Sequence, residues 1–159
     1  MIGGIAVAIH GYLRATRDLD LAIVTGHLRE HAAALDEAGI PAHYFAPDEM
    51  DPVDGVVRIE VAGADPVEIV NFGTTHPSVR QRLGLDAVQC AKPVLEGSSL
   101  PIVGLGHLVA MKLLGGGIQD RADIVMLLRG RSVDEIADVE DTCARYALTE
   151  ALARVRAER

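Results

Sequence analysis

Two aspartates separated by one residue are the part of this sequence best suited to chemistry. Asp18 and Asp20 enter the apolar run at residues 21–24, which is typical of a strand. Because side chains alternate across a strand, we expect both carboxylates on one face. A cation relieves the repulsion between two such charges, and Mg²⁺ prefers oxygen ligands that it shares with the phosphates of a substrate. The spacing therefore predicts a metal site beside a phosphate site.

Gly3 and Gly4 are the candidates for that phosphate site. They precede the apolar residues 5–9, which we interpret as a helix. Glycine lets backbone N–H groups approach a ligand closely, and a helix N-terminus favours anions. Alone, a glycine pair is most often a turn, and two carboxylates on an edge strand often serve solubility. Their joint occurrence in this order favours a triphosphate cradle beside a metal.

The same segment resembles the nucleotidyltransferases of the DNA polymerase β-like superfamily. It is most similar to the small bacterial branch that includes abortive-infection toxins of toxin–antitoxin systems. The resemblance covers about residues 2–128. The matching motifs are residues 3–7, His10-Gly11, Arg14, Thr16 and residues 18–21, followed by a third-carboxylate strand at 67–70, a lysine helix at 110–114 and an acidic helix at 120–124.

This resemblance implies transfer of a nucleoside monophosphate from a Mg²⁺-bound NTP, such as ATP, to an acceptor hydroxyl by a two-metal mechanism. The implied catalytic residues and ligands of two Mg²⁺ ions are Asp18, Asp20 and Glu68. The implied nucleotide-binding residues are Gly3, Gly4, Arg14, Thr16 and Lys112.

Two departures from the family pattern bear on activity. The third carboxylate of the family is usually an aspartate, whereas this chain has the longer Glu68. Family members also have a helix and a strand before the two glycines, whereas here Met1 and Ile2 precede them. We expect the corresponding strand to be absent because of a late start, a trimmed chain or a segment that another chain supplies.

The resemblance leaves the acceptor open. Toxin-like relatives modify tRNA ends, which would add an antitoxin protein as a partner. Relatives of another branch modify aminoglycoside or lincosamide antibiotics, and an acidic chain suits a cationic small molecule. A third alternative is a catalytically silent relative that binds a nucleotide or a protein partner.

The composition of the chain argues against one of these acceptors, an RNA. The net charge of −8 and the 3% aromatic content argue against extended RNA binding, which relies on basic and aromatic side chains. With 159 residues and 49% hydrophobic content, one well-buried core is expected.

Cys90 and Cys143 lack metal-ligand spacing, and no signal peptide or membrane-length apolar segment is evident. We therefore expect a cytoplasmic protein with reduced thiols and no membrane partner.

The predicted fold is α+β: a nucleotidyltransferase-like mixed sheet flanked by helices, with a helical C-terminal tail. Residues 1–103 are predicted to form the α/β core, and residues 104–159 a helical region packed on it. We predict that strands 56–61 and 67–72 pair antiparallel through a turn at 63–66, which lets Glu68 approach the two aspartates. The other predicted helices are 4–12, 27–38, 77–83, 105–114, 121–128, 133–145 and 149–158, and the other predicted strands are 18–24, 43–46, 87–91 and 100–103.

Four polar residues have competing interpretations. Lys112 lies in an apolar helix, so it either extends to solvent or reaches the triphosphate. Asp120 and Asp123 fit the positive end of a helix dipole, with a role facing the active site as the alternative for Asp120. His10 is expected to be structural.

Overall fold

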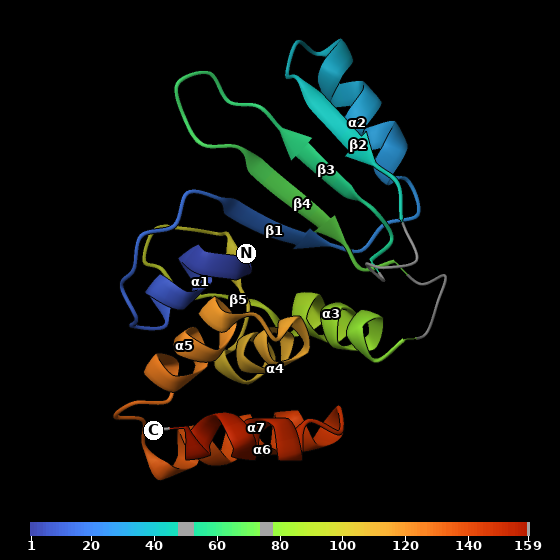
Figure 1. The fold of residues 1–159 in the computed structure, drawn as a ribbon. Coiled ribbons are helices and arrows are strands. Elements are labelled where there is room, and N and C mark those ends of the chain that lie inside the picture. Colours follow the sequence, from blue (N-terminus) through green and yellow to red (C-terminus); the bar gives the residue numbers. More distant parts are fainter. Residues whose placement is uncertain (48–52, 74–77, 159) are drawn as a thin grey trace.

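The computed structural model describes residues 1–47, 53–73 and 78–158. These residues form seven helices, a four-stranded mixed sheet and a small two-stranded sheet (Figure 1). The α+β class predicted from the sequence is confirmed. None of the described helices is long and apolar enough to cross a membrane.

The main sheet has the strand order β1–β4–β3–β2. Strands β1 (Leu19–Ile23) and β4 (Val67–Asn71) are parallel, whereas β3 (Val56–Ile59) is antiparallel to both β4 and β2 (Ala42–Phe45). The predicted antiparallel pairing around the turn at 63–66 is confirmed. Parallel pairing of β1 with β4 brings the two strands that carry the predicted carboxylates side by side.

Helices cover the two faces of this sheet unequally (Figure 1). Helix α2 (Leu28–Glu37) packs on one face, where Leu28, Ala32 and Val57 are buried together. On the other face lie α1 (Gly3–Ile9), α3 (Val79–Cys90) and α4 (Leu105–Gly115). The alternation along β1 explains the two environments, because Leu21 and Ile23 face opposite to Asp20 and Ala22.

The larger core joins the sheet to the C-terminal helices. These are α5 (Ile118–Leu127), α6 (Val133–Arg145) and α7 (Thr149–Ala157). Buried apolar residues from Ile2 to Val155 belong to one cluster, so residues 1–103 and 104–159 share a core. Helix α6 begins as predicted: the Ser132 hydroxyl accepts a hydrogen bond from the Glu135 N–H, and the Glu135 carboxylate accepts one from the Ser132 N–H at 2.9 Å.

The strand predicted at residues 87–91 is wrong, since residues 87–90 form the last turn of helix α3 and Ala91 is its C-cap. A capping box at Ser78 and Gln81 starts this helix, with the Ser78 hydroxyl accepting from the Gln81 N–H at 3.2 Å. Leu83 and Ala87, four residues apart, are both buried on its inner side. Cys90 is therefore exposed at a helix end and does not lie in a strand. The two-residue strands β5 (Lys92–Pro93) and β6 (Pro101–Ile102) follow, the latter inside the predicted range 100–103.

Candidate functional site

The register of β1 and β4 aligns two of the predicted carboxylates. Asp20 is the direct neighbour of Glu68 in the parallel pairing, so the two side chains share a face of the sheet. Asp18 lies two residues before Asp20, at the exposed approach to β1. The predicted proximity of the Glu68 strand to the aspartate strand is confirmed.

Glu68 has a basic neighbour that the sequence analysis did not select. Arg58 lies opposite it on β3, and the Nη1 atom of Arg58 is 3.5 Å from Oε1 of Glu68. The same guanidinium donates from Nε to Oε1 of Glu60 at 3.1 Å. The only advance signal was the alternation of residues 56–61, which places Arg58 and Val56 on one face. Glu68 is thus ion-paired on the side away from Asp20.

Asp20 lies against the first turn of α1. Gly3 has a φ of +68°, and a Cβ atom there would come within 1.7 Å of the Asp20 Oδ2 atom. The Asp20 carboxylate also accepts a hydrogen bond from the Gly4 N–H. A Cβ atom on Gly4 would come within 2.4 Å of the Thr16 hydroxyl. The glycine pair therefore allows Asp20 and Thr16 to pack closely on the backbone that the sequence predicts to bind phosphate.

The charge environment of Asp20 opposes its ionisation. Burial raises the pKa of Asp20, and the neighbouring Asp18 raises it further. The Gly4 N–H, Lys112 and Arg14 act in the opposite direction but do not offset these two effects. An added cation next to Asp18 and Asp20 would stabilise the ionised pair.

Arg14 and Lys112 are both bound to Asp123, which is completely buried. Arg14 donates to it from Nε at 2.7 Å and from Nη2 at 2.9 Å. The ammonium of Lys112, whose residue is 8% exposed, lies 2.7 Å from Asp123 and 3.0 Å from Asp120. Lys112 therefore does not extend to solvent. A contact of Arg14 or Lys112 with a triphosphate stays a prediction.

The two acidic residues of α5 have different roles. Asp120 accepts a hydrogen bond from the Gly117 N–H at 3.2 Å and so caps the helix start. Asp123 lies deeper and is not explained by the helix dipole that the sequence analysis preferred. Burial works to raise its pKa, but hydrogen bonds from Arg14, Lys112 and Gln119 hold the pKa of Asp123 below its usual value. The preference for Asp123 as a residue at the helix dipole was wrong, because two cations from other helices and loops converge on it.

The described residues supply only part of a donor set for the predicted Mg²⁺ ions. Among the residues that the structure describes, no three His, Cys, Asp or Glu side chains are grouped closely enough to hold a metal. Asp18 and Asp20 still supply the hard oxygen donors that Mg²⁺ prefers. Glu68 is directed to Arg58, and its side chain is 36% exposed. The aspartate pair thus offers the oxygen donors of a metal site, whereas a ligand role for Glu68 stays a prediction because its carboxylate is paired with Arg58.

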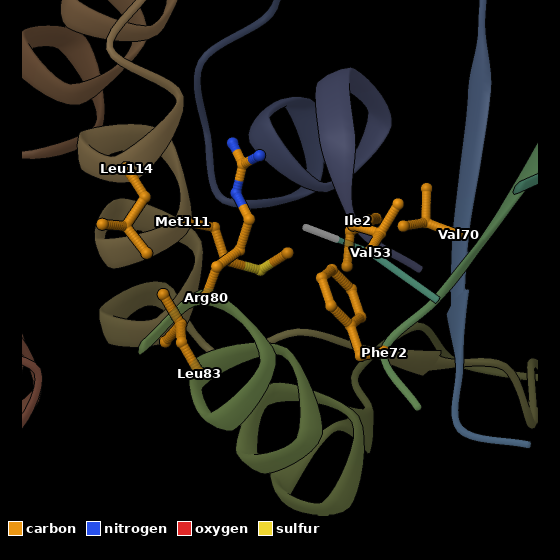
Figure 2. A pocket seen from close by; sticks show the side chains of 8 residues that line it. All are labelled: Ile2, Val53, Val70, Phe72, Arg80, Leu83, Met111 and Leu114. Carbon is orange, nitrogen blue, oxygen red and sulfur yellow. The ribbon is translucent and has the colours of Figure 1, made fainter. Parts of the chain in front are cut away.

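Two cavities adjoin these residues. The first, of about 200 Å³, lies between the sheet and helices α3 and α4 (Figure 2). In this view Phe72 points toward Ile2 and Val53, across from Met111 and Leu114. Two residues that line this cavity directly precede predicted site residues in the sequence: Ile2 precedes Gly3, and Met111 precedes Lys112. The remaining lining side chains are Val70, Arg80 and Leu83.

The second cavity, of about 290 Å³, is directly beside the third carboxylate. Glu68 and Arg58 form its polar part, and Phe45 and Val56 contribute apolar surface. Phe45 is 54% exposed, which is high for a large aromatic side chain.

The predicted site residues are therefore largely gathered in one region. Asp18, Arg14 and Lys112 all act electrostatically on Asp20, which also contacts the first turn of α1. Glu68 is on the adjacent strand, although its carboxylate is engaged elsewhere. His10 is structural as expected, because its Nε2 atom is 2.7 Å from the Val103 carbonyl oxygen.

Neither a family model nor a curated protein matches this chain.

Proposed function

We propose that this protein is a nucleotidyltransferase that moves a nucleoside monophosphate from a Mg²⁺-bound NTP to an acceptor hydroxyl. The observation that carries the proposal is the alignment of Asp20 with Glu68 across two parallel strands, with Asp18 adjacent. The raised pKa of Asp20 supports it, because the charge of Asp18 contributes to the rise and an added cation would relieve that repulsion.

In this proposal Asp18 and Asp20 would hold Mg²⁺, and Glu68 would be a further ligand if it were released from Arg58. When bound, Mg²⁺ neutralises charge on the NTP phosphates and lowers the pKa of the acceptor hydroxyl. Glu68 accepts the hydroxyl proton as the acceptor oxygen attacks the α-phosphorus. The bond from the α-phosphorus to the bridging oxygen breaks, and pyrophosphate leaves with its electron pair.

Positive charge for the departing pyrophosphate comes from Arg14 and Lys112. Both are already oriented by Asp123, so binding a phosphate would not require them to be ordered anew. Gly3 and Gly4 lie at the same place, with Asp20 and Thr16 packed on their backbone and Arg14 beside Gly4.

The cavity beside Glu68 is the proposed acceptor position. Its Phe45 and Val56 surface suits a small hydroxyl-bearing molecule, as in aminoglycoside-type or lincosamide-type transfer. A tRNA end, as in the toxin branch, would have to approach a chain with a net charge of −8.

A second candidate function is nucleotide binding without catalysis. The ion pair between Arg58 and Glu68 favours it, because it holds the Glu68 carboxylate away from Asp18 and Asp20.

Calorimetric titration of each NTP, with and without Mg²⁺, tests the proposal. We expect Mg²⁺-dependent binding that the Asp18→Asn/Asp20→Asn variant weakens by about tenfold or more. The matched control is Asp36→Asn/Glu37→Gln, which changes two exposed carboxylates of α2 on the opposite face. Absence of binding to the wild-type protein would overturn the proposal. If an NTP binds, pyrophosphate release in the presence of tRNA, an aminoglycoside or a lincosamide would show catalysis, and its absence would show binding alone.

A further inference from the structure

The cavity of about 200 Å³ between the sheet and helices α3 and α4 lies beside the proposed nucleotide site. Its wall on the sheet includes Val70, which follows Glu68 by two residues on β4 and therefore shares its face. Two residues of a strand span roughly 6.7 Å. Ile2, which also lines the cavity, donates its N–H to the Asp20 carbonyl at 2.9 Å. The cavity therefore begins about the length of one ribose from the aligned carboxylates of Asp20 and Glu68.

The walls of this cavity suit a flat aromatic ring. Phe72, directly after β4, and Met111 of α4 lie across from each other (Figure 2). A Cβ atom on Gly84 would come within 2.1 Å of the Phe72 ring, so this ring rests on the backbone of α3 and is held in place. A thioether adapts to the shape of its neighbours and makes favourable contacts with aromatic rings. Because nucleobases stack on aromatic side chains, a base fits between these two residues.

The cavity also has a polar part that discriminates between bases. Among the described residues that line it, Arg80 alone has a polar side chain. In Figure 2 this side chain is extended from α3, and its guanidinium reaches past Met111 toward α1. A guanidinium holds its N–H donors in one plane and matches two acceptors that lie side by side. Guanine offers O6 and N7 in this arrangement, whereas adenine has an amino group, itself a donor, in place of O6.

The acceptor molecule is a less suitable occupant than the base. Its hydroxyl has to lie next to Glu68, which is proposed to take the proton. Glu68 lines the cavity of about 290 Å³ on the other side of Val53 and does not line the present one. The two cavities therefore suit two different parts of the reaction, the acceptor and the nucleotide.

We propose that the cavity between the sheet and helices α3 and α4 holds the base of the nucleotide, and that Arg80 makes guanine the preferred purine. This inference rests on the proposed function, since it requires the triphosphate to lie at Asp18 and Asp20. The base stacks between Phe72 and Met111, and the Arg80 guanidinium donates to O6 and N7. The ribose spans the distance from the cavity to the carboxylates.

Ribose 5′-triphosphate separates base binding from phosphate binding, because it has the ribose and the phosphates but no base. Calorimetry in the presence of Mg²⁺ should show that GTP binds about tenfold or more tightly than either ribose 5′-triphosphate or ATP. Equal affinities for GTP and ribose 5′-triphosphate would overturn this inference and leave the proposed function standing. Absence of binding by all three ligands would overturn the proposed function, and this inference with it.

Filling the cavity tests its occupation by the base. Leu114 lines it from a half-buried position, so Leu114→Trp adds volume there. This variant should bind GTP about tenfold more weakly and ribose 5′-triphosphate as the wild-type protein does. Leu113→Trp is the matched control, because Leu113 is also half-buried on α4 but does not line this cavity. Thermal melting shows whether both variants are folded. An unchanged affinity of Leu114→Trp for GTP, or an equal loss for both ligands, would overturn the inference.

Replacing Arg80 tests the preference for guanine without filling the cavity. Arg80→Met keeps an unbranched side chain and removes the N–H donors. We expect its affinity for GTP to fall about tenfold, to the level of ATP, while the affinities for ATP and ribose 5′-triphosphate stay the same. Arg82→Met, at an exposed position of the same helix, should leave all three unchanged. An equal loss for all three ligands in Arg80→Met would overturn the inference, because Arg80 would then act on the phosphates.

Discussion

Arg14 and Asp123 form a two-point ion pair between residues 109 positions apart in the sequence. Nε and Nη2 of Arg14 donate to the two oxygens of a carboxylate that is fully buried. This contact fixes the loop between α1 and β1 to helix α5. It therefore positions the segment that carries Thr16 and Asp18 relative to the C-terminal helices.

Removing the buried carboxylate should strongly destabilise the protein. Asp123→Ala leaves Arg14 and Lys112 without their shared partner, and loss of one member of a buried pair costs about 3–5 kcal/mol. Denaturant unfolding measures this free energy. Asp120→Ala is the matched control on the same helix, and its cost should be smaller because Asp120 is 29% exposed in its side chain. Equal costs for both variants would contradict the central role of Asp123.

Replacing Gly3 should affect both folding and nucleotide binding. Alanine at a φ of +68° costs about 1–2 kcal/mol, and its Cβ atom would displace the Asp20 carboxylate. We expect Gly3→Ala to lower the melting temperature and to weaken Mg²⁺-NTP binding. Gly26→Ala is the control, since a Cβ atom there meets no atom within 4 Å. Unchanged binding by a folded Gly3→Ala variant would separate the glycine pair from the nucleotide site.

Lys112 allows its structural role and its proposed phosphate role to be measured separately. Lys112→Ala removes the ion pairs to Asp120 and Asp123, so the melting temperature should fall. At temperatures at which the Lys112→Ala variant is folded, the affinity of the variant for NTP should also be reduced, because a positive charge near Asp20 is lost. If stability falls while the NTP affinity measured by calorimetry stays the same, Lys112 serves Asp120 and Asp123 alone.

His107 should make stability depend on pH on the acidic side of neutrality. Burial lowers its pKa from 6.5, with the nearby Asp86 acting in the opposite direction, and its Nε2 atom is buried without a partner among the described residues. The unfolded chain therefore binds a proton at a higher pH than the folded chain. The titration of His107 therefore leaves the free energy of unfolding unchanged above about pH 6.5 and lowers it as the pH falls toward the folded-state pKa of His107.

Melting temperatures between about pH 7.5 and 5.5 measure this effect. His107→Phe should reduce the decrease on acidification, whereas His43→Gln, at an exposed position of β2, should leave it unchanged. An identical pH dependence in His107→Phe and the wild-type protein would assign the decrease to other groups.

Local sequence signals predicted most of the helices and strands, because caps and turns are formed by residues that are close together in the sequence. Ser132 and Glu135 marked the start of α6, and the turn at 63–66 marked a hairpin. The error at residues 87–91 arose because a short apolar run fits a strand or a buried helix equally well. The capping box at Ser78 starts the helix, and the inward spacing of Leu83 and Ala87 continues it.

The sequence identified several residues that lie near Asp20 in the structure, but it did not identify how they pair. The Asp18 and Asp20 spacing is a local signal, whereas the contacts of Asp123 with Arg14 and of Glu68 with Arg58 depend on the packing of distant segments. Charge sign and residue type do not identify such partners. Lys112 illustrates this limit, because neither of its two predicted environments included an acidic partner from α5.

The central claim, a Mg²⁺-nucleotide site at Asp18 and Asp20, is tested most directly by NMR with Mn²⁺-ATP in place of Mg²⁺-ATP. The paramagnetic ion broadens the amide signals of residues close to it. We predict broadening of Gly4, Asp18 and Asp20 in the wild-type protein, and its loss in Asp18→Asn/Asp20→Asn. Unchanged signals at these residues, or broadening elsewhere that the variant retains, would contradict the account.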